Sequence, residues 1–475
     1  MVFSSNLFLF GFLPVVLTLH YLLPARLQNL FLFVASVLFY AWGSGPIVVP
    51  FVAGIAFNYW SGALIARAAK ASRSRARLFL VATLCADCAL LFYYKYFNFF
   101  CDQLSSVLGL FGVHWHQTSR VALPIGISFF VFQAMTYPIE IYRGQQEPAR
   151  RFVDVGAYLA LFAHLIAGPV VRYSEISREL RKRSVTVGSF FYGVQLFAVG
   201  LGKKVLIANQ LSVVADRAFG AAPTSLGPAM AWLGALCYAL QIYFDFSGYS
   251  DMAIGLAEFF GFHFPENFDH PYRATSITDF WRRWHMTLSR WFRDFLYIPL
   301  GGNQKGRVRT YVNLFAVFFL CGLWHGAAWN FVVWGMFHGT LLVVERVLKA
   351  RFGFVPSGFV GTVVTCSLVF VGWIFFRAAD TAAALSYLRT MFGLAPAPVG
   401  FEYHPLAYQL TRSLTFTLAC AAILTWMPLD RFRRLSVWTR PLGVTLVGAR
   451  SLVLIFCSAA VLSTVGYNPF IYFRF

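Results

Sequence analysis

Long apolar runs separated by short polar or basic loops follow one another along almost the whole chain. A helix needs about 20 residues to cross the hydrocarbon of a bilayer, and many of the runs approach or exceed that length. Some neighbouring runs are short enough to be joined, so they predict about eleven membrane spans in an all-α, polytopic helical bundle. The candidate runs are residues 6–24, 27–43, 46–66, 78–98, 119–142, 187–213, 228–244, 246–262, 310–324, 327–347, 357–377, 411–429 and 449–468.

The segment 153–171 is predicted to enter the membrane without crossing it. Arg150 and Arg151 precede it, and a basic run from Arg172 to Arg183 follows it. Basic loops stay on the cytoplasmic side, so a full crossing would place one of these groups on the wrong side. Gly168-Pro169 also interrupts a helix. Non-helical backbone is tolerated at membrane depth where protein buries it, which predicts a re-entrant segment.

Composition supports a chain that is solvated mainly by lipid. Hydrophobic residues make up 59% of the 475 residues and charged residues 12%, whereas soluble domains have about 25% charged residues. The net charge is +20, and the basic residues lie at the ends of apolar runs. This pattern indicates loops retained on the cytoplasmic side and argues against nucleic-acid binding. Lys95, Lys203 and Lys204 lie near span ends, where we expect their ammonium groups to extend to water.

The stretch from Asp279 to Asp294 combines arginines, tryptophans and one histidine. Ser276 and Asp279 form an S-x-x-D helix start. On a continuous helix at about 100° per residue, the arginines share one face and the aromatic residues another, with His285 at the boundary. One interpretation is an interfacial helix on lipid headgroups. Another, compatible with it, is a face that binds the phosphates of an anionic acyl donor. The arginines are Arg282, Arg283, Arg290 and Arg293.

His325 is the strongest candidate for catalysis, because apolar spans lie on both sides of it. Imidazole can accept a hydroxyl proton at neutral pH. Gly322 and Gly326 flank it, and their missing side chains would let a substrate chain approach. A structural histidine bonded to a backbone carbonyl is the alternative, but a second histidine, His285, 40 residues upstream favours catalysis. His338, in the next span, is interpreted as structural.

Several other polar and aromatic residues are candidates for supporting roles. Asp245 and Asp251 interrupt an apolar run, and they are expected to pair with the arginines or to orient a histidine. The aromatic and amide residues next to the two histidines are Trp284, Trp324 and Asn330. We expect no metal and no tightly bound cofactor.

Ten short motifs, in this order, resemble the membrane-bound O-acyltransferase (MBOAT) family, and within it the bacterial branch that acetylates alginate. The resemblance runs nearly end to end, so one MBOAT membrane domain is expected over residues 1–475, with a motif core at about 120–347. The motifs are Met1 to Asn6, Tyr94 to Asn98, Leu123 to Phe129, His164 to Pro169, Tyr243 to Met252, Phe280 to His285, Leu300 to Asn303, Leu323 to Gly326, Trp373 to Arg377 and Pro469 to Phe473.

The resemblance implies a role for each histidine and a direction of transfer. The family's deeply placed histidine falls on His325, and its second polar site residue falls on His285. The donor substrate would be acetyl-CoA or another acyl thioester on the cytoplasmic side of the bacterial inner membrane. The expected partners are membrane lipid, periplasmic SGNH-type acetyltransferases and the exopolysaccharide machinery.

Other functions remain open from the sequence alone. Acyl transfer for cellulose, peptidoglycan or teichoic acid (as D-alanine) is an alternative within the enzyme class. An acyl-group transporter or a scaffold without chemistry are alternatives outside it. The sequence has no HExxH, no G-x-S-x-G and no P-loop motif, so a metalloprotease, a serine nucleophile and a P-loop NTPase are unsupported.

Overall fold

The computed structural model describes all residues except 1, 223–224, 354–355, 396–405, 428–440 and 465–475. The expected motif at Pro469 to Phe473 therefore lies outside the described residues. Every regular element in the described part is helical, which confirms the all-α prediction. The chain divides into two compact units, one of Met1–Phe197 with Ser250–Pro265 and one of Ala198–Tyr249 with Glu266–Phe475. The two units are described separately below.

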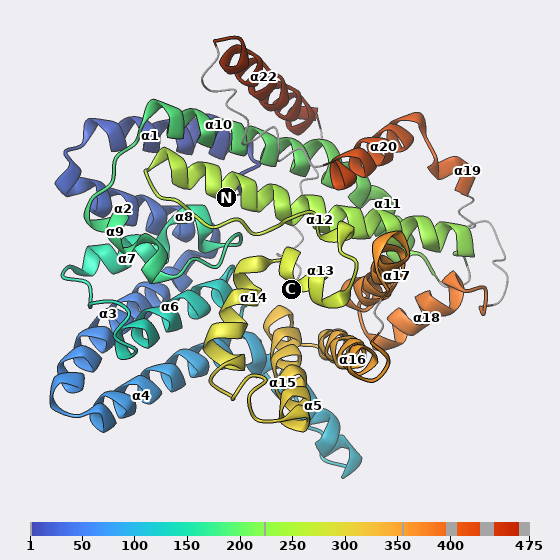
Figure 1. Cartoon of the computed structure of the whole chain (residues 1–475), viewed down its shortest axis with the longest axis horizontal. Coiled ribbons are helices and arrows are strands. Elements are labelled where there is room, and N and C mark those ends of the chain that lie inside the picture. The colour runs from blue at the N-terminus through green and yellow to red at the C-terminus, as the bar shows by residue number, and fades with distance from the viewer. Residues whose placement is uncertain (1, 223–224, 354–355, 396–405, 428–440, 465–475) are drawn as a thin grey trace. The chain divides into compact units, whose positions relative to one another are not determined.

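The first unit is built around helices from the N-terminal part of the chain. Helices α3 and α4 are joined at Ser72 and pack against each other as a hairpin, and both contact α6 (Figure 1). The elements are η1 (Phe8–Phe12), α1 (Leu13–Leu22), α2 (Ala25–Ser44), η2 (Gly45–Ile47), α3 (Val48–Ala71), α4 (Arg73–Leu91), η3 (Phe92–Tyr96), α5 (Phe97–Leu110), α6 (Ile127–Tyr142), α7 (Phe152–Ala160), α8 (Phe162–Leu165), α9 (Tyr173–Arg181), the first part of α10 (Val187–Gly202) and the last part of α12 (Pro228–Phe259).

Residues 153–171, predicted to be re-entrant, form two short helices, α7 and α8. The nine residues of α7 extend only about 14 Å, too little for a hydrocarbon layer of about 30 Å. The helix breaks at Leu161, and residues 154–171 are all buried. The Tyr158 hydroxyl donates to the carbonyl oxygens of Gln133 and Val171. Burial by protein is what a re-entrant segment requires, and its depth in the bilayer stays a prediction.

The predicted span at 119–142 is wrong in its first third. Helix α6 begins at Ile127, and its 16 residues are about 24 Å long. Gly126 ends the preceding loop with a φ of 76°, a conformation that favours glycine. A side chain at Gly126 would meet the Leu165 carbonyl oxygen at 2.6 Å, so the loop is pressed against the buried segment.

The second unit contains the motif-rich part of the sequence. Its elements are the end of α10, η4 (Lys203–Ala208), α11 (Asn209–Gly220), the first part of α12, η5 (Pro271–Arg273), α13 (Ile277–Arg283), α14 (Met286–Phe292), η6 (Arg293–Tyr297), α15 (Arg307–His325), α16 (Trp329–Phe352), α17 (Gly358–Arg377), α18 (Thr381–Met391), α19 (Leu406–Gln409), α20 (Arg412–Trp426) and α22 (Pro441–Thr464).

Eight helical stretches among the described residues are long and apolar enough to cross a membrane. Four of them have 32 residues or more, which is longer than one crossing needs, and the stretch Ala25–Ala71 contains both α2 and α3. Two shorter apolar helical segments, Phe8–Leu22 and Arg412–Trp426, coincide with other predicted runs. A multi-pass membrane protein is thus supported, and the number of about eleven spans stays a prediction.

The predicted spans 228–244 and 246–262 are one continuous helix, α12, of 32 residues. Asp245 does not interrupt it, because its carboxylate is 1% exposed and lies 2.6 Å from the Lys204 ammonium nitrogen. Lys204 is therefore buried in protein and does not extend to water as expected. In the first unit the buried Lys95 likewise donates to the Ser128 hydroxyl, at 2.9 Å. Paired polar groups of this kind can stay inside an apolar helix without breaking it.

Helices α15 and α16 approach each other backbone to backbone. A side chain on Gly322 would meet the Phe331 carbonyl oxygen at 2.3 Å, and one on Gly335 would meet the Phe318 carbonyl oxygen at 2.2 Å. Small residues permit this closeness in membrane helices. A side chain on Gly326 would meet the ring of Phe331 at 2.2 Å, so the expectation that Gly322 and Gly326 make room for a substrate is wrong. Both glycines instead make room for α16.

Gly335→Ala is expected to push α15 and α16 apart, because the added carbon cannot avoid a backbone carbonyl. Overpacking of this kind costs about 1–3 kcal/mol, so the midpoint of thermal unfolding in detergent should fall by several degrees. Gly448→Ala on α22 is the matched control, since nothing lies within 4 Å of its added carbon. Alanine also favours the helix there. Equal thermal stability of the two variants would contradict the close approach.

Candidate active site

The stretch from Asp279 to Asp294 is not the single continuous helix on which the predicted faces depend. The Ser276 hydroxyl caps α13 by accepting from the Asp279 amide, as expected. The helix then ends at Arg283, and α14 begins at Met286 (Figure 1). His285 lies at the break with φ 43° and ψ 54°, the left-handed region that a non-glycine residue seldom adopts. The helical face that we predicted for the four arginines therefore does not exist.

Asn267 holds this break in place. Its carbonyl oxygen accepts from the Met286 amide, and its side-chain oxygen accepts from the amide and the hydroxyl of Thr287. The same side-chain oxygen lies 3.0 Å from Nδ1 of His285. These bonds replace the helical hydrogen bonds lost at the break. Since backbone strain outside glycine persists only where the surroundings hold it, the break has the character of a functional device.

The hydrogen bond to Asn267 also fixes the proton on His285. The Thr287 amide can only donate, so the Asn267 atom that faces it is an acceptor, and His285 must donate to it through Nδ1–H. Nε2 then carries the lone pair. His285 is 1% exposed, and burial lowers its pKa to about 3, so the imidazole is neutral at physiological pH. It can accept a hydrogen bond or a proton through Nε2, but it cannot donate through that atom.

His325 is the last residue of α15 and is 6% exposed. Its ring centroid lies 4.9 Å from that of Trp324, 5.0 Å from that of Trp334 and 5.0 Å from that of Phe376. Trp324 also lies 6.0 Å from His285, ring centroid to ring centroid. The two predicted catalytic histidines, which are 40 residues apart in sequence, thus both lie close to the same indole ring within the second unit.

The remaining predicted site residues fall into two groups. Trp284 is buried, directly precedes the break, and stacks on Phe280 with ring centroids 5.6 Å apart. Asn330 is buried and donates to the carbonyl oxygens of Phe375 and Ala378, so it closes the end of α17. Neither side chain shows a contact with His325 or His285 among these interactions. They support the surrounding helices, and a direct role in binding stays a prediction.

The acidic candidates are separated by the division of the chain. Asp245 belongs to the second unit and forms the ion pair with Lys204, in place of the arginine that we predicted. Asp251 is buried and belongs to the first unit.

Two of the four arginines are engaged by neighbouring carboxylates. Arg283 pairs with Asp279 at 2.9 Å and with Asp269 at 3.3 Å. Arg293 pairs with Asp294 at 2.6 Å. Arg282 is exposed. Because the helix breaks between Arg283 and Arg290, a shared phosphate-binding face is not formed in the way we predicted, and a role for each arginine in donor binding stays a prediction.

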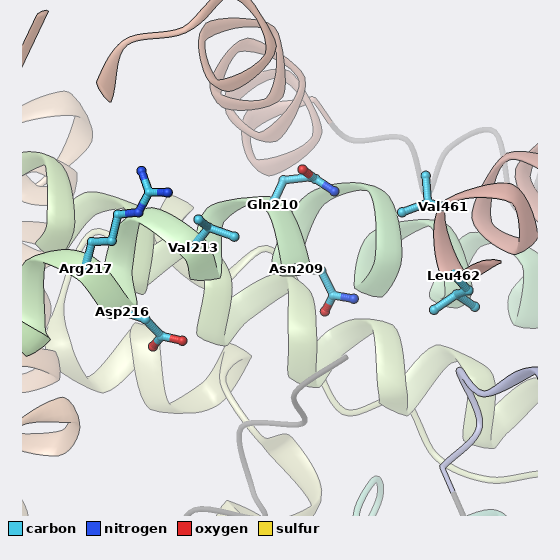
Figure 2. Close-up of a pocket in the computed structure, with 7 residues that line it drawn as sticks. All are labelled: Asn209, Gln210, Val213, Asp216, Arg217, Val461 and Leu462. Atoms are coloured by element: carbon cyan, nitrogen blue, oxygen red, sulfur yellow. The ribbon is translucent and has the colours of Figure 1, made fainter. Parts of the chain in front are cut away.

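One cavity in the second unit has a volume of about 490 Å³, and neither His285 nor His325 is among the residues that line it. Figure 2 shows polar side chains of α11 on one wall and two apolar side chains of α22 on the other. Asp216, on the polar wall, pairs with Arg377 at 2.5 Å. The wall offers no imidazole, so this cavity is not the predicted site of chemistry. Its lining residues are Asn209, Gln210, Val213, Asp216, Arg217, Val461 and Leu462.

Sequence reasoning missed Asn267, Trp281 and Trp334, and it treated His338 as structural. Asn267 lies 18 residues before His285 in an irregular loop, so no periodic pattern connects them. Trp334 and His338 are four residues apart on α16, a spacing that places both on one helix face. This spacing, in the span that follows His325, was the signal in the sequence that could have linked Trp334 and His338 to the site. Among the described residues, no group of three or more His, Cys, Asp or Glu side chains could hold a metal ion.

The family model of the membrane-bound O-acyltransferases matches residues 150–388. This chain belongs to the MBOAT family and is an O-acyltransferase. It is 41% identical over 499 residues to a probable alginate O-acetylase AlgI of Pseudomonas putida, with 100% of both chains covered. It is 46% identical to the protein of the same name from Azotobacter vinelandii, over 82% of this chain and 78% of that one. A peptidoglycan O-acetyltransferase of Helicobacter pylori is 36% identical, over 83% and 80%.

Lys204→Met should destabilise the second unit, because it leaves the Asp245 carboxylate buried without its cation. Breaking one partner of a buried pair costs about 3–5 kcal/mol, whereas replacing both with apolar residues of similar size is often neutral. The double variant Lys204→Met with Asp245→Leu should therefore recover most of the loss. Thermal unfolding of the three proteins in detergent measures this, and a double variant less stable than the single one would refute the pairing.

Asn267→Asp should change the pH dependence of acyl transfer. A carboxylate beside Nδ1 favours the charged imidazolium, so it raises the pKa of His285 above its native value of about 3. The acid limb of the rate profile should then move to higher pH, since protonated Nε2 can no longer accept. Asp269→Asn serves as the control, because it changes a neighbouring exposed carboxylate. Superimposable profiles of the native protein and Asn267→Asp would show that His285 does not act through its lone pair.

Proposed function

We propose that this enzyme transfers acetyl groups that end on an exopolysaccharide, with alginate as the favoured polymer. The observation that carries the proposal is the pair of buried imidazoles, His285 and His325, whose ring centroids lie 6.0 Å and 4.9 Å from that of Trp324. The proteins named as probable alginate O-acetylases at 41% and 46% identity support the choice of acetyl group and polymer.

The donor in this proposal is acetyl-CoA or another acetyl thioester from the cytoplasm. His325 takes the proton from an incoming hydroxyl, and the hydroxyl oxygen attacks the carbonyl carbon of the thioester. The tetrahedral intermediate then collapses, the C–S bond breaks, and the thiolate leaves with the proton returned by His325. The products are an ester and a free thiol, so the step is balanced without any other reagent.

The tautomer of His285 limits the part that it can take in this proposal. Its Nε2 lone pair can accept from the attacking hydroxyl or from the charged His325, and it cannot polarise the thioester carbonyl by donating to it. His285 is thus proposed to orient the reacting hydrogen-bond donors. The stabilisation of negative charge on the carbonyl oxygen must come from other groups.

The cellular setting follows from the same proposal. The enzyme would lie in the bacterial inner membrane and pass acetyl groups to the periplasmic side, where SGNH-type acetyltransferases and the exopolysaccharide machinery complete the transfer. The hydroxyl that receives the acetyl group in the membrane is a side chain of such a partner or a sugar of the polymer. A peptidoglycan acceptor is the second candidate, favoured by the 36% identity to the Helicobacter pylori enzyme.

His325→Ala should lower the rate of acetyl transfer by about 10²–10⁴-fold, the usual contribution of a general base. The O-acetyl content of the secreted polymer should fall accordingly. The level of the variant in the membrane fraction is measured alongside. His114→Ala, on an exposed loop, is the matched control and should keep the native acetate content. Native acetylation by His325→Ala would reject the catalytic role.

The same proteins distinguish an enzyme from a transporter. Purified native protein with acetyl-CoA and an intact acceptor should release free CoA, and His325→Ala should not. Acetyl delivery without release of a thiol would reject the enzymatic proposal in favour of transport.

A further inference from the structure

Three rings form a second polar cluster, which contacts His325 through one of them, Trp334. Trp281, Trp334 and His338 contact one another pairwise, with ring centroids 5.1 Å apart for Trp281 and His338, 5.1 Å for Trp334 and His338, and 5.7 Å for Trp281 and Trp334. All three pairs meet edge to face, with angles of 74°, 87° and 68° between the ring planes. We call them the indole–imidazole corner.

The corner is buried and polar at once. His338 is fully buried, Trp334 is 1% exposed, and the indole nitrogen of Trp281 is buried too. Among the described residues, neither ring nitrogen of His338 and neither indole nitrogen of Trp281 and Trp334 has a hydrogen-bond partner. Buried polar groups are nearly always hydrogen-bonded, so four nitrogen atoms in one cluster point to a ligand.

The chemistry of these atoms defines what they can bind. Each indole offers one N–H donor and no acceptor, and a neutral imidazole adds one donor and one acceptor. The cluster is thus rich in donors, up to three N–H groups against one lone pair. Such a set suits an oxygen that accepts several hydrogen bonds, above all one that is gaining negative charge. Phenylalanine at position 338 would fill a similar space without the cost of burying two nitrogens.

The position of the corner matches the place where such an oxygen forms. A general base lies about 3 Å from the hydroxyl that attacks, and the attacked carbon lies about 3 Å further on. With the bent path of attack, the carbonyl oxygen lies roughly 5 Å from the base. The ring centroids of Trp334 and His325 are 5.0 Å apart, and Trp334 is one of the three rings of the corner, so the corner adjoins the proposed base. His285 cannot fill this role, since its Nδ1–H is committed to Asn267.

We propose that Trp281, Trp334 and His338 bind the carbonyl oxygen of the acyl thioester and stabilise its negative charge during transfer. This inference rests on the proposed function and adds the electrostatic half of it. When the hydroxyl oxygen bonds to the carbonyl carbon, the electron pair of the C=O bond moves to oxygen, and the N–H groups of the corner hold that charge. The pair returns to reform C=O as the C–S bond breaks.

The test uses the full-length purified enzyme and two donors, acetyl-CoA and its dithioacetyl counterpart, in which sulfur replaces the carbonyl oxygen. Sulfur is a weaker acceptor, so the native enzyme should prefer the oxygen donor. His338→Phe and Trp334→Phe should each lower kcat for acetyl-CoA by about 10²-fold, the usual loss for one such donor, with KM little changed. In these variants the rate with acetyl-CoA divided by the rate with the dithioacetyl donor should fall towards the value of the uncatalysed reactions.

The ratio is measured within each variant, so it does not depend on how much of the protein is folded. His338→Gln, which keeps an N–H group, should recover part of the ratio. Trp373→Phe is the matched control, because its indole nitrogen already donates to the Tyr272 hydroxyl, and it should keep the native ratio.

An unchanged ratio in His338→Phe and Trp334→Phe would overturn the inference and leave an internal water as the occupant of the corner. The inference would also be overturned if Trp373→Phe lowered the ratio of the two rates as much as the other two variants do. The proposed function fails separately: if His325→Ala still releases CoA at the native rate, the base is misassigned whatever the corner does. If His325→Ala is inactive while both Phe variants keep the native ratio, only the inference about the corner is wrong.

Discussion

The contact between the backbones of α15 and α16 is the constraint on which the candidate site depends. Gly322 and Gly335 lie where any side chain would strike a carbonyl oxygen of the other helix. Lipid gives helices little hydrophobic reason to associate, so close packing and polar contacts must hold them. That packing brings the end of α15 against α16 and sets His325 beside Trp334. Chemistry at His325 thus depends on two residues that have no side chain.

In the proposed site several ring nitrogens share the work of acyl transfer, and the proton position is fixed by a hydrogen bond at His285. Asn267 holds His285 in a strained conformation and in one tautomer, which leaves it an acceptor. His325 is the remaining imidazole for the proton of the attacking hydroxyl. The donors that a developing oxyanion needs are then those of Trp281, Trp334 and His338. The base and the proposed charge stabiliser adjoin each other at Trp334, whose ring centroid lies 5.0 Å from that of His325.

The sequence was sufficient for the class of fold, because apolar length is a local signal. It also singled out two histidines that the structure buries close to one indole ring, and their catalytic role stays a prediction. It was insufficient wherever a distant residue changes the backbone. The break at His285 depends on Asn267, so a helix drawn from periodicity alone ran through it and grouped the arginines wrongly. The unbroken helix at Asp245 depends on Lys204 on a different helix. Glycines next to His325 looked like space for substrate, and only the packed partner helix shows that the space is filled.

The most direct test of the account is a structure of the enzyme in a lipid nanodisc with an unreactive thioether analogue of acetyl-CoA, in which a CH₂ group separates sulfur from the carbonyl. The account predicts that the carbonyl carbon lies within about 5 Å of the His325 ring, with its oxygen directed at the ring nitrogens of His338 and Trp334. An analogue whose acetyl group lies in the cavity between α11 and α22, or anywhere away from His325, would contradict it.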